Sequence, residues 1–229
     1  MKTHTSIFNT VLFDLDGTLA DTAPDLANAL NAVRCDRGHR PLPYERIRPV
    51  VSHGTNALIE LGFQIGPDNK AFDEIKGQLL DFYQAHIAVE TRLFPGMAEV
   101  LRTIEAQGKN WGVVTNKPGY LTTPLMRALH LEERAACIVS GDTTARPKPD
   151  PAPMYHACKL AGSRAEQCLY IGDAKRDIEA GRNAGMKTLA ALFGYLNEAD
   201  TPSEWGADGL IQHPSDILNW LTWEPVGLG

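Results

Sequence analysis

The sequence predicts an α/β protein: a doubly wound parallel sheet whose first strand is followed by an all-helical insertion. After residue 91, short apolar runs alternate with helical patterns of about 10–15 residues, which is typical of a parallel sheet with helices on both faces. Between Pro24 and about Glu90, only helical periodicity is found. Residues 1–20 and 91–229 therefore form the predicted core domain, and residues 21–90 form a separate helical domain.

The first predicted strand ends in carboxylates. The apolar residues Val11–Phe13 are followed directly by Asp14, and then by Asp16 and Gly17. Two residues apart at a strand end, Asp14 and Asp16 can face the same side. Ligands bind at the carboxyl ends of the strands in open α/β sheets, so we expect the functional site here.

The helical insertion is predicted from apolar residues at three-to-four spacing. The predicted helical segments cover residues 25–37, 44–51, 56–61 and 72–88. Asp21 is expected to cap the first helix or to fix a hinge. His53 and Gly54 lie in a loop between two segments. They are either a plain helix end or residues that face the site and select the substrate.

Polar residues also follow several later strands. Strands are predicted over residues 111–116, 135–140, 168–172 and 187–192, with a weaker one over residues 209–212. Helices are predicted over residues 97–107, 118–129 and 177–185. A further helix follows the loop of residues 141–153 and ends at Ala161, and a last one begins at Pro214. The polar residues at these strand ends and in one loop are Thr115, Asn116, Lys117, Lys148, Asp173 and Asp177.

The predicted sheet edge carries an excess of negative charge. Asp14, Asp16, Asp173 and Asp177 would repel one another there unless a cation were present. Mg²⁺ is expected, since it takes hard oxygen ligands and keeps waters and a substrate phosphate. Lys148 adds positive charge and can pair with a carboxylate and a phosphate oxygen.

This set of residues suits phosphoryl transfer. Asp14 can attack phosphorus and form an aspartyl-phosphate. Asp16 can protonate the leaving alcohol and then take a proton from water. Thr115 and Asn116 can hold the phosphoryl oxygens, because phosphoryl transfer depends mostly on positioning and charge neutralisation. Lys117 is predicted either to contact the substrate or to be a solvated lysine.

Composition narrows the classes of partner. Lys and Arg total 22 against 28 Asp and Glu, and no long basic run is present, which argues against nucleic acid and anionic membranes. No apolar stretch approaches the roughly 18 residues of a membrane span, and the N-terminus lacks the pattern of a signal peptide. The four cysteines show no C-x-x-C, and free thiols are expected, with a Cys158–Cys168 pair as the alternative. We expect a cytoplasmic monomer or homodimer that acts on a small phosphorylated metabolite.

Four segments together resemble the motifs of the haloacid dehalogenase superfamily, in its phosphatase branch. They are F-D-L-D-G-T from Phe13, T-N from Thr115, R-P-K-P-D-P around Lys148, and G-D-A-K-R-D from Gly172. The resemblance implies a Rossmann-like core, a helical cap formed by residues 21–90, and phosphatase activity.

The same resemblance implies roles for the site residues. Asp14 would be the nucleophile and Asp16 the acid/base, whereas true dehalogenases lack this second aspartate. Mg²⁺ would be held by Asp14, the backbone carbonyl of Asp16 and Asp173, with support from Asp177. The implied phosphate-binding residues are Thr115 and Asn116, and Lys148 would orient the nucleophile and the phosphate.

Within that branch, the chain resembles bacterial phosphoglycolate phosphatases and, more closely, N-acetylmuramic acid 6-phosphate phosphatases of cell-wall sugar recycling. The matching segments begin at Gly112, Tyr170 and Ser203. The expected substrates are therefore N-acetylmuramic acid 6-phosphate or 2-phosphoglycolate. Two alternatives are a phosphosugar mutase that uses the same nucleophile, similar to β-phosphoglucomutase, and a non-catalytic binding module on the same fold. Arg176 is expected to be a surface charge.

Overall fold

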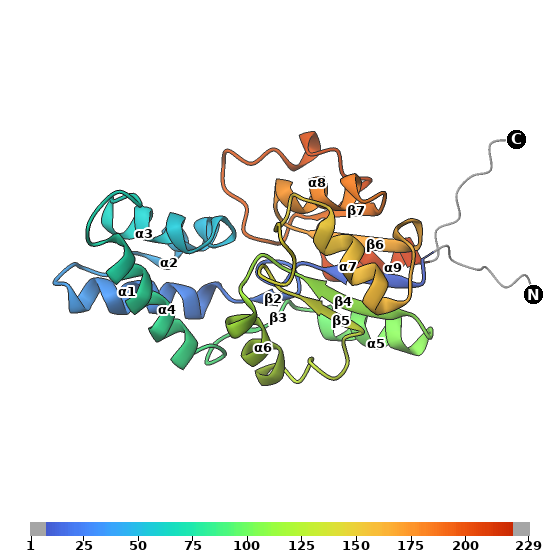
Figure 1. The fold of residues 1–229 in the computed structure, drawn as a ribbon, viewed down its shortest axis with the longest axis horizontal. Coiled ribbons are helices and arrows are strands. Elements are labelled where there is room, and N and C mark those ends of the chain that lie inside the picture. Colours follow the sequence, from blue (N-terminus) through green and yellow to red (C-terminus); the bar gives the residue numbers. More distant parts are fainter. Residues whose placement is uncertain (1–7, 222–229) are drawn as a thin grey trace, which may run out of the picture.

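A six-stranded sheet forms the core of the computed structural model, which describes residues 8–221 (Figure 1). Its strand order is β5-β4-β1-β6-β7-β8, and every neighbouring pair is parallel. The strands are β1 (Thr10–Phe13), β4 (Asn110–Val114), β5 (Cys137–Val139), β6 (Cys168–Gly172), β7 (Lys187–Ala191) and β8 (Gly209–Ile211). The predicted parallel α/β fold is confirmed.

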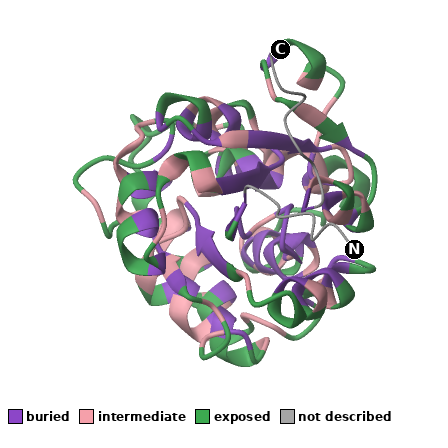
Figure 2. Ribbon diagram, turned by 90° about the vertical axis from the view of Figure 1, so that its right-hand side faces the viewer, coloured by how far each residue is buried: buried purple, intermediate pink, exposed green. Residues whose placement is uncertain are grey.

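Helices cover both faces of this sheet. Because side chains alternate along a strand, Val11 and Phe13 of β1 point to one face and Leu12 to the other. The first face packs against α5 (Met97–Ala106), α6 (Gly119–Ala128) and α9 (Ile217–Leu221), and the second against α7 (Ala152–Ala161) and α8 (Lys175–Asn183). Figure 2 shows the strands buried between helices that expose one side. This two-sided cover is why β1 is apolar without alternation.

A group of helices lies beside the core (Figure 1), and two short strands precede and follow it in the sequence. Its helices are α1 (Ala23–Asp36), α2 (Tyr44–Ile47), α3 (Thr55–Phe63) and α4 (Phe72–Ala85). The flanking strands, β2 (Ala20–Asp21) and β3 (Arg92–Leu93), pair antiparallel and bring the two ends of this helical insertion together. These strands are missing from the sequence prediction because two residues carry no measurable periodicity.

Two helical segments of the insertion differ from their predicted bounds. The segment predicted as one helix over residues 44–51 divides into α2 and a 3₁₀ segment, η1 (Arg48–His53). Pro49 lacks the N–H that an α-helix would need at this position, so the chain tightens instead. The last predicted helix of the insertion ends at Ala85 rather than at residue 88. The predicted frayed tail, residues 224–229, lies outside the described residues.

The insertion contacts the core through polar side chains. The Arg48 guanidinium donates to the carbonyl oxygens of Phe193 and Gly194, both at 3.1 Å. The Ser52 hydroxyl of η1 and the Tyr83 hydroxyl of α4 also bond to core side chains. No helix in residues 8–221 is long and apolar enough to cross a bilayer. The four cysteines are free, as predicted, although the Cys158 and Cys168 sulfur atoms lie 3.7 Å apart.

Tyr195 anchors the start of the insertion. Its hydroxyl accepts hydrogen bonds from the backbone N–H groups of Thr22 and Ala23, at 2.6 and 2.9 Å, and donates to Asp21 at 2.7 Å. Asp21 therefore acts on the first turn of α1 through Tyr195, because α1 has no side-chain cap of its own. From the sequence alone, Tyr195 is most simply a packing residue.

Replacing Tyr195 with Phe should lower the free energy of unfolding by roughly 1–3 kcal/mol, because two buried N–H groups would lose their acceptor. Urea denaturation followed by circular dichroism measures this change. Tyr155→Phe is the control, since Tyr155 is 52% exposed and its hydroxyl makes a long bond of 3.3 Å. Equal stability of Tyr195→Phe and the wild type would show that the hydroxyl does not anchor α1.

Candidate active site

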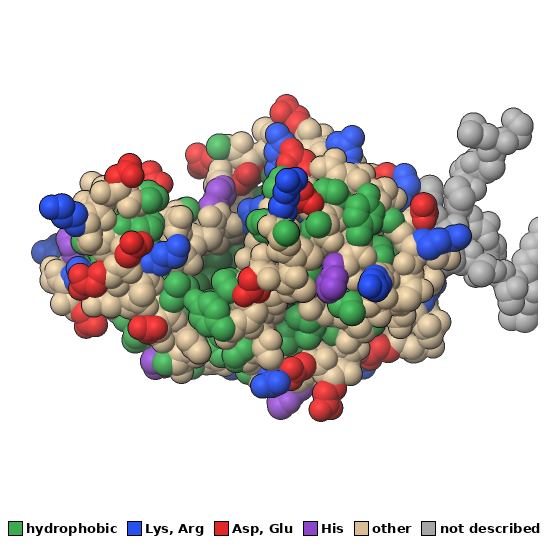
Figure 3. Space-filling view, viewed as in Figure 1, with side chains coloured by type: hydrophobic (Ala, Val, Ile, Leu, Met, Phe, Trp, Pro, Cys, Tyr) green, Lys and Arg blue, Asp and Glu red, His purple; other side chains and the backbone are tan. Residues whose placement is uncertain are grey.

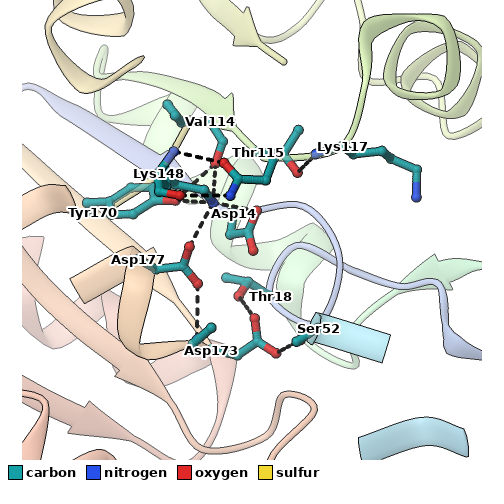
Figure 4. Close-up of polar contacts among 12 residues, drawn as sticks. Asp14, Thr18, Ser52, Val114, Thr115, Lys117, Lys148, Tyr170, Asp173 and Asp177 are labelled. Carbon is teal, nitrogen blue, oxygen red and sulfur yellow. Dashed lines mark hydrogen bonds and ion pairs between the residues drawn. The ribbon is translucent and has the colours of Figure 1, made fainter. Parts of the chain in front are cut away.

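Three of the four predicted carboxylates meet at the carboxyl edge of the sheet. Asp14 follows β1, Asp173 follows the neighbouring strand β6, and Asp177 lies in the first turn of α8. One oxygen atom of each lies within 4.8 Å of the others, and all three side chains are buried (Figure 4). Adjacent parallel strands bring together groups that are far apart in the sequence.

Lys148 neutralises part of this cluster. Its ammonium lies 2.9 Å from Asp14 Oδ1 and 2.7 Å from Asp177 Oδ1, and it also donates to the Val114 carbonyl and the Tyr170 hydroxyl, both at 2.9 Å (Figure 4). Within residues 8–221, these two carboxylate oxygens have this ion pair and no other hydrogen-bond donor. Lys148 is therefore placed to orient the Asp14 carboxylate from behind.

Asp173 is held by three donors. It accepts hydrogen bonds from the Thr18 hydroxyl at 3.1 Å, the Ser52 hydroxyl at 2.7 Å and the Tyr195 backbone N–H at 2.9 Å. Ser52 was not predicted as a site residue, and its only signal is that it precedes His53 in the loop singled out from the sequence. Its hydrogen bond joins the helical insertion directly to the acidic cluster (Figure 4).

Burial and mutual repulsion shift the ionisation of the cluster. Burial raises the pKa of Asp173 to about 7, and the nearby charges of Asp14 and Asp177 add to this increase. Burial also raises the pKa of Asp14, by more than the Lys148 ammonium lowers it. The folded protein therefore resists placing three negative charges together without a further cation.

The cluster fits a divalent metal ion. Three buried carboxylates outnumber the two nearby cations, Lys148 and Arg176, and buried charge must be compensated. Carboxylate oxygens are the ligands that Mg²⁺ and Ca²⁺ prefer. Gly17, with φ +86°, is what lets the chain pass Asp173, because a Cβ atom there would lie 2.2 Å from Asp173 Oδ2.

The metal-free protein should show a pH-dependent stability that originates at Asp173. The pKa of this carboxyl is raised from 3.8 to about 7, so between these pH values the folded state binds a proton that the unfolded state has lost. Its contribution to the free energy of unfolding should therefore fall as the pH rises from about 4 to 7. Asp173→Asn removes the titration, so the wild type should lose stability relative to this variant over that range.

Thermal unfolding in EDTA at a series of pH values measures this difference. Adding MgCl₂ should restore the stability of the wild type at neutral pH more than that of Asp173→Asn, because metal ligands bind in their ionised form. A wild type that gains stability relative to the variant between pH 4 and 7 would contradict the raised pKa.

Asp16 lies outside the acidic cluster. Its Oδ1 atom accepts hydrogen bonds from the Lys117 ammonium at 2.8 Å and the Thr22 hydroxyl at 2.6 Å. Its Oδ2 atom has no hydrogen-bond partner in the described part of the chain, and Asp16 lines the cavity described below. The structure thus separates the two predicted catalytic carboxylates, one facing the cluster and the other facing Lys117.

The Lys117 side chain is only 7% exposed, so it is not the solvated lysine considered as one alternative. Its ammonium bonds to the Tyr83 hydroxyl of α4 at 2.9 Å and lies 4.5 Å from the centre of that ring. Burial lowers the pKa of Lys117, but Asp16 and Tyr83 raise it further, so the net shift is upward. Burial raises the pKa of Tyr83 itself to about 12. Lys117 therefore joins Asp16 of the core to the helical insertion.

Asn116 and Thr115 follow β4 as predicted and line the same cavity. The Asn116 side chain donates to the Lys148 carbonyl at 3.0 Å and accepts from the Lys148 N–H at 2.9 Å. It therefore holds the loop that carries Lys148, a role that was not predicted. The Thr115 hydroxyl accepts from the Lys117 N–H at 3.2 Å, which leaves its proton free to donate.

A cavity of about 430 Å³ lies between the helical insertion and the core. Figure 3 shows the hollow between these two parts, with hydrophobic side chains along it. Asp14, Asp16, Thr115 and Asn116 line its core side, and the predicted pair His53 and Gly54 lines its insertion side. The lining also includes the apolar residues Leu26, Val51, Leu58, Leu80 and Leu121.

Arg176 differs from its prediction. It was expected as a surface charge, but it is half-buried and lines this cavity. Burial lowers the pKa of Arg176, while the carboxylates of Asp177, Asp14 and Asp173 raise it by more. Arg176 therefore belongs to the charge balance of the acidic cluster.

Comparison with known proteins agrees with the fold. The family of haloacid dehalogenase-like hydrolases matches residues 11–191. The chain belongs to this family. It is 43% identical to the N-acetylmuramic acid 6-phosphate phosphatase of Pseudomonas aeruginosa, over 92% of this chain and 93% of that protein. It is 40% identical to a phosphoglycolate phosphatase of Xanthomonas campestris, over 94% of this chain and 95% of that protein.

A solved structure shows the same architecture. The crystal structure of a predicted phosphoglycolate phosphatase from Haemophilus somnus aligns with a TM-score of 0.82 at 27% identity, covering 93% of this chain and 98% of that one. The predicted enzyme class, a phosphoric monoester hydrolase, is confirmed by these relatives. Their names do not favour the mutase alternative.

Proposed function

We propose that this hydrolase is a Mg²⁺-dependent phosphomonoesterase that works through an aspartyl-phosphate on Asp14. The observation that carries the proposal is the position of Asp14. Its carboxylate is fixed by Lys148, and Asp14 also lines the cavity between the helical insertion and the core. Asp14, Asp173 and Asp177 would hold the metal ion, with the backbone carbonyl of Asp16. The ion would supply positive charge that stabilises the phosphoryl oxygens.

The reaction can be written with the residues in place. A carboxylate oxygen of Asp14 attacks phosphorus, and the bond between phosphorus and the leaving oxygen breaks. Asp16 gives a proton to that oxygen, and in the second step it takes one from the water that attacks the phosphorus of the aspartyl-phosphate. Because Asp16 Oδ1 is engaged by Lys117 and Thr22, the free Oδ2 atom is the one suited to carry this proton. Inorganic phosphate leaves and the Asp14 carboxylate is regenerated.

We propose N-acetylmuramic acid 6-phosphate as the preferred substrate, ahead of 2-phosphoglycolate. The relative from Pseudomonas aeruginosa is named for the first compound and the relative from Xanthomonas campestris for the second. A cavity of about 430 Å³ with an apolar wall is far larger than a two-carbon acid needs, and it suits an amino sugar with its acetyl group.

The helical insertion is proposed to act as a cap. Residues 21–90 supply η1, α3 and α4, which line the insertion side of the cavity. The chain re-enters the core through the β2–β3 pair, which gives the cap a two-stranded base. A cytoplasmic location and a monomeric or homodimeric state remain predictions.

A phosphate-release assay tests the proposal. The purified enzyme is offered N-acetylmuramic acid 6-phosphate, 2-phosphoglycolate and glucose 6-phosphate, each with MgCl₂ and with EDTA. We expect phosphate release that requires the metal ion and is fastest with the first substrate. Comparable weak rates on all three would contradict a dedicated sugar-phosphate role, and full activity in EDTA would contradict the metal dependence.

A further inference from the structure

One cation in the cavity lining has no counter-charge. Lys76 of α4 lines the cavity, and its ammonium has no ion-pair or hydrogen-bond partner within residues 8–221. The other cations of the lining are compensated, since Lys117 pairs with Asp16 at 2.8 Å and Arg176 lies beside the acidic cluster. Lysine is almost never fully buried without a partner, and Lys76 is half-buried in this lining. An unpaired, half-buried cation that faces a ligand cavity indicates an anionic ligand group.

The position of Lys76 on α4 limits where that anionic group can be. Lys76, Leu80 and Tyr83 are spaced by four and three residues, so they share one face of the helix, and all three line the cavity. Tyr83 bonds to Lys117, which in turn pairs with Asp16. At 1.5 Å per residue, Lys76 lies about 10 Å along the helix axis from Tyr83. It therefore lies about two helical turns from the tyrosine that is linked through Lys117 to Asp16.

This distance distinguishes between the proposed substrates. In 2-phosphoglycolate, a single methylene separates the carboxylate from the ester oxygen, so the carboxylate stays close to the reacting phosphate. In N-acetylmuramic acid 6-phosphate, the lactyl carboxylate lies across the sugar ring from the phosphate. Leu80, between Lys76 and Tyr83 on the same helix face, provides an apolar surface for that ring.

We propose that Lys76 binds a carboxylate that the substrate carries across a sugar ring from its phosphate, and that this contact selects N-acetylmuramic acid 6-phosphate. The proposal rests on the proposed phosphatase function and names a residue that recognises the sugar part of the substrate. Lys76 contacts the substrate without taking part in the bond changes at Asp14, so its effect falls on substrate binding.

Steady-state kinetics with two sugar phosphates test this role. N-acetylglucosamine 6-phosphate has the same ring, acetyl group and phosphate as the proposed substrate but has a free hydroxyl in place of the lactyl ether that carries the carboxylate. Lys76→Gln should raise KM for N-acetylmuramic acid 6-phosphate about 10–100-fold, the range for a lost hydrogen bond to a charged group, with little change in kcat. It should leave both constants for N-acetylglucosamine 6-phosphate nearly unchanged.

Two further variants complete the test. Lys76→Arg keeps the charge and should recover most of the discrimination, and Lys70→Gln, which removes an exposed lysine outside the cavity, should have no effect. An unchanged ratio of kcat/KM for the two sugars in Lys76→Gln, with an active wild type, would overturn the role of Lys76 alone. A wild type that releases phosphate from neither sugar nor from 2-phosphoglycolate would overturn the proposed function as well.

Discussion

Replacing Asp14 with Asn is expected to reduce phosphate release by at least about 10⁴-fold, because the amide cannot attack phosphorus as a carboxylate does. The variant should still fold. Asn removes one of three buried negative charges, so its free energy of unfolding without metal should equal or exceed that of the wild type. Initial rates with N-acetylmuramic acid 6-phosphate, together with urea denaturation, measure both effects.

Asp68→Asn provides the matched control for this substitution. Asp68 is an exposed carboxylate in the segment between α3 and α4, so its loss should change neither rate nor stability. A folded Asp14→Asn protein that keeps more than a small fraction of wild-type activity would show that another group attacks the phosphate.

Replacing Lys148 with Met should cause the largest loss of stability. The substitution leaves the Asp14 and Asp177 carboxylates buried without the ammonium that pairs with both, and breaking a buried ion pair in this way costs about 3–5 kcal/mol. Activity should fall together with stability, because the nucleophile loses the group that orients it. Urea denaturation in EDTA measures the stability, with Lys159→Met, at an exposed position, as the control.

A second variant distinguishes loss of charge from loss of packing as the cause of the lower stability. Removing a carboxylate in the double variant Lys148→Met/Asp177→Asn should recover part of the lost stability, because the excess negative charge is smaller. MgCl₂ should also stabilise Lys148→Met more than it stabilises the wild type. A double variant less stable than Lys148→Met alone would show that the lysine acts mainly through packing.

Much of the fold could be predicted because its signals are local. Val11–Phe13 and Cys168–Gly172 are apolar runs that stop at carboxylates, and the parallel sheet then requires their ends to lie at one edge. The meeting of Asp14, Asp173 and Asp177 follows from that topology alone. Lys148 lies in a Pro-rich loop and does not directly follow a strand, so this argument does not place it. Its position in a loop after a strand was still enough to predict it as a site residue.

The remaining features depend on contacts between distant segments. The Tyr83–Lys117 hydrogen bond spans 34 residues, and the Ser52–Asp173 bond spans 121 residues. Neither residue pair has a local pattern that distinguishes it from ordinary packing or solvated side chains. The anchoring role of Tyr195 is hidden for the same reason, since an aromatic residue after a strand is most simply a core residue.

The side of the helical insertion that faces the site was predicted only in part. His53 and Gly54 were singled out because they interrupt a helical pattern, and both line the cavity. Lys76 has no such signal, because a lysine between Ile75 and Gly77 looks like any solvent-facing helical residue. Only the packing of α4 beside the core shows that its face points into the cavity.

Trapping the covalent intermediate tests the central claim most directly. The enzyme is mixed with N-acetylmuramic acid 6-phosphate and MgCl₂, quenched with acid within one turnover, digested and analysed by mass spectrometry. We predict that the peptide containing Asp14 gains the mass of one phosphoryl group, and that this gain is absent in Asp14→Asn. Phosphate release in the same quenched samples without any modification of Asp14, or with the phosphoryl group on another residue, would contradict the proposed mechanism.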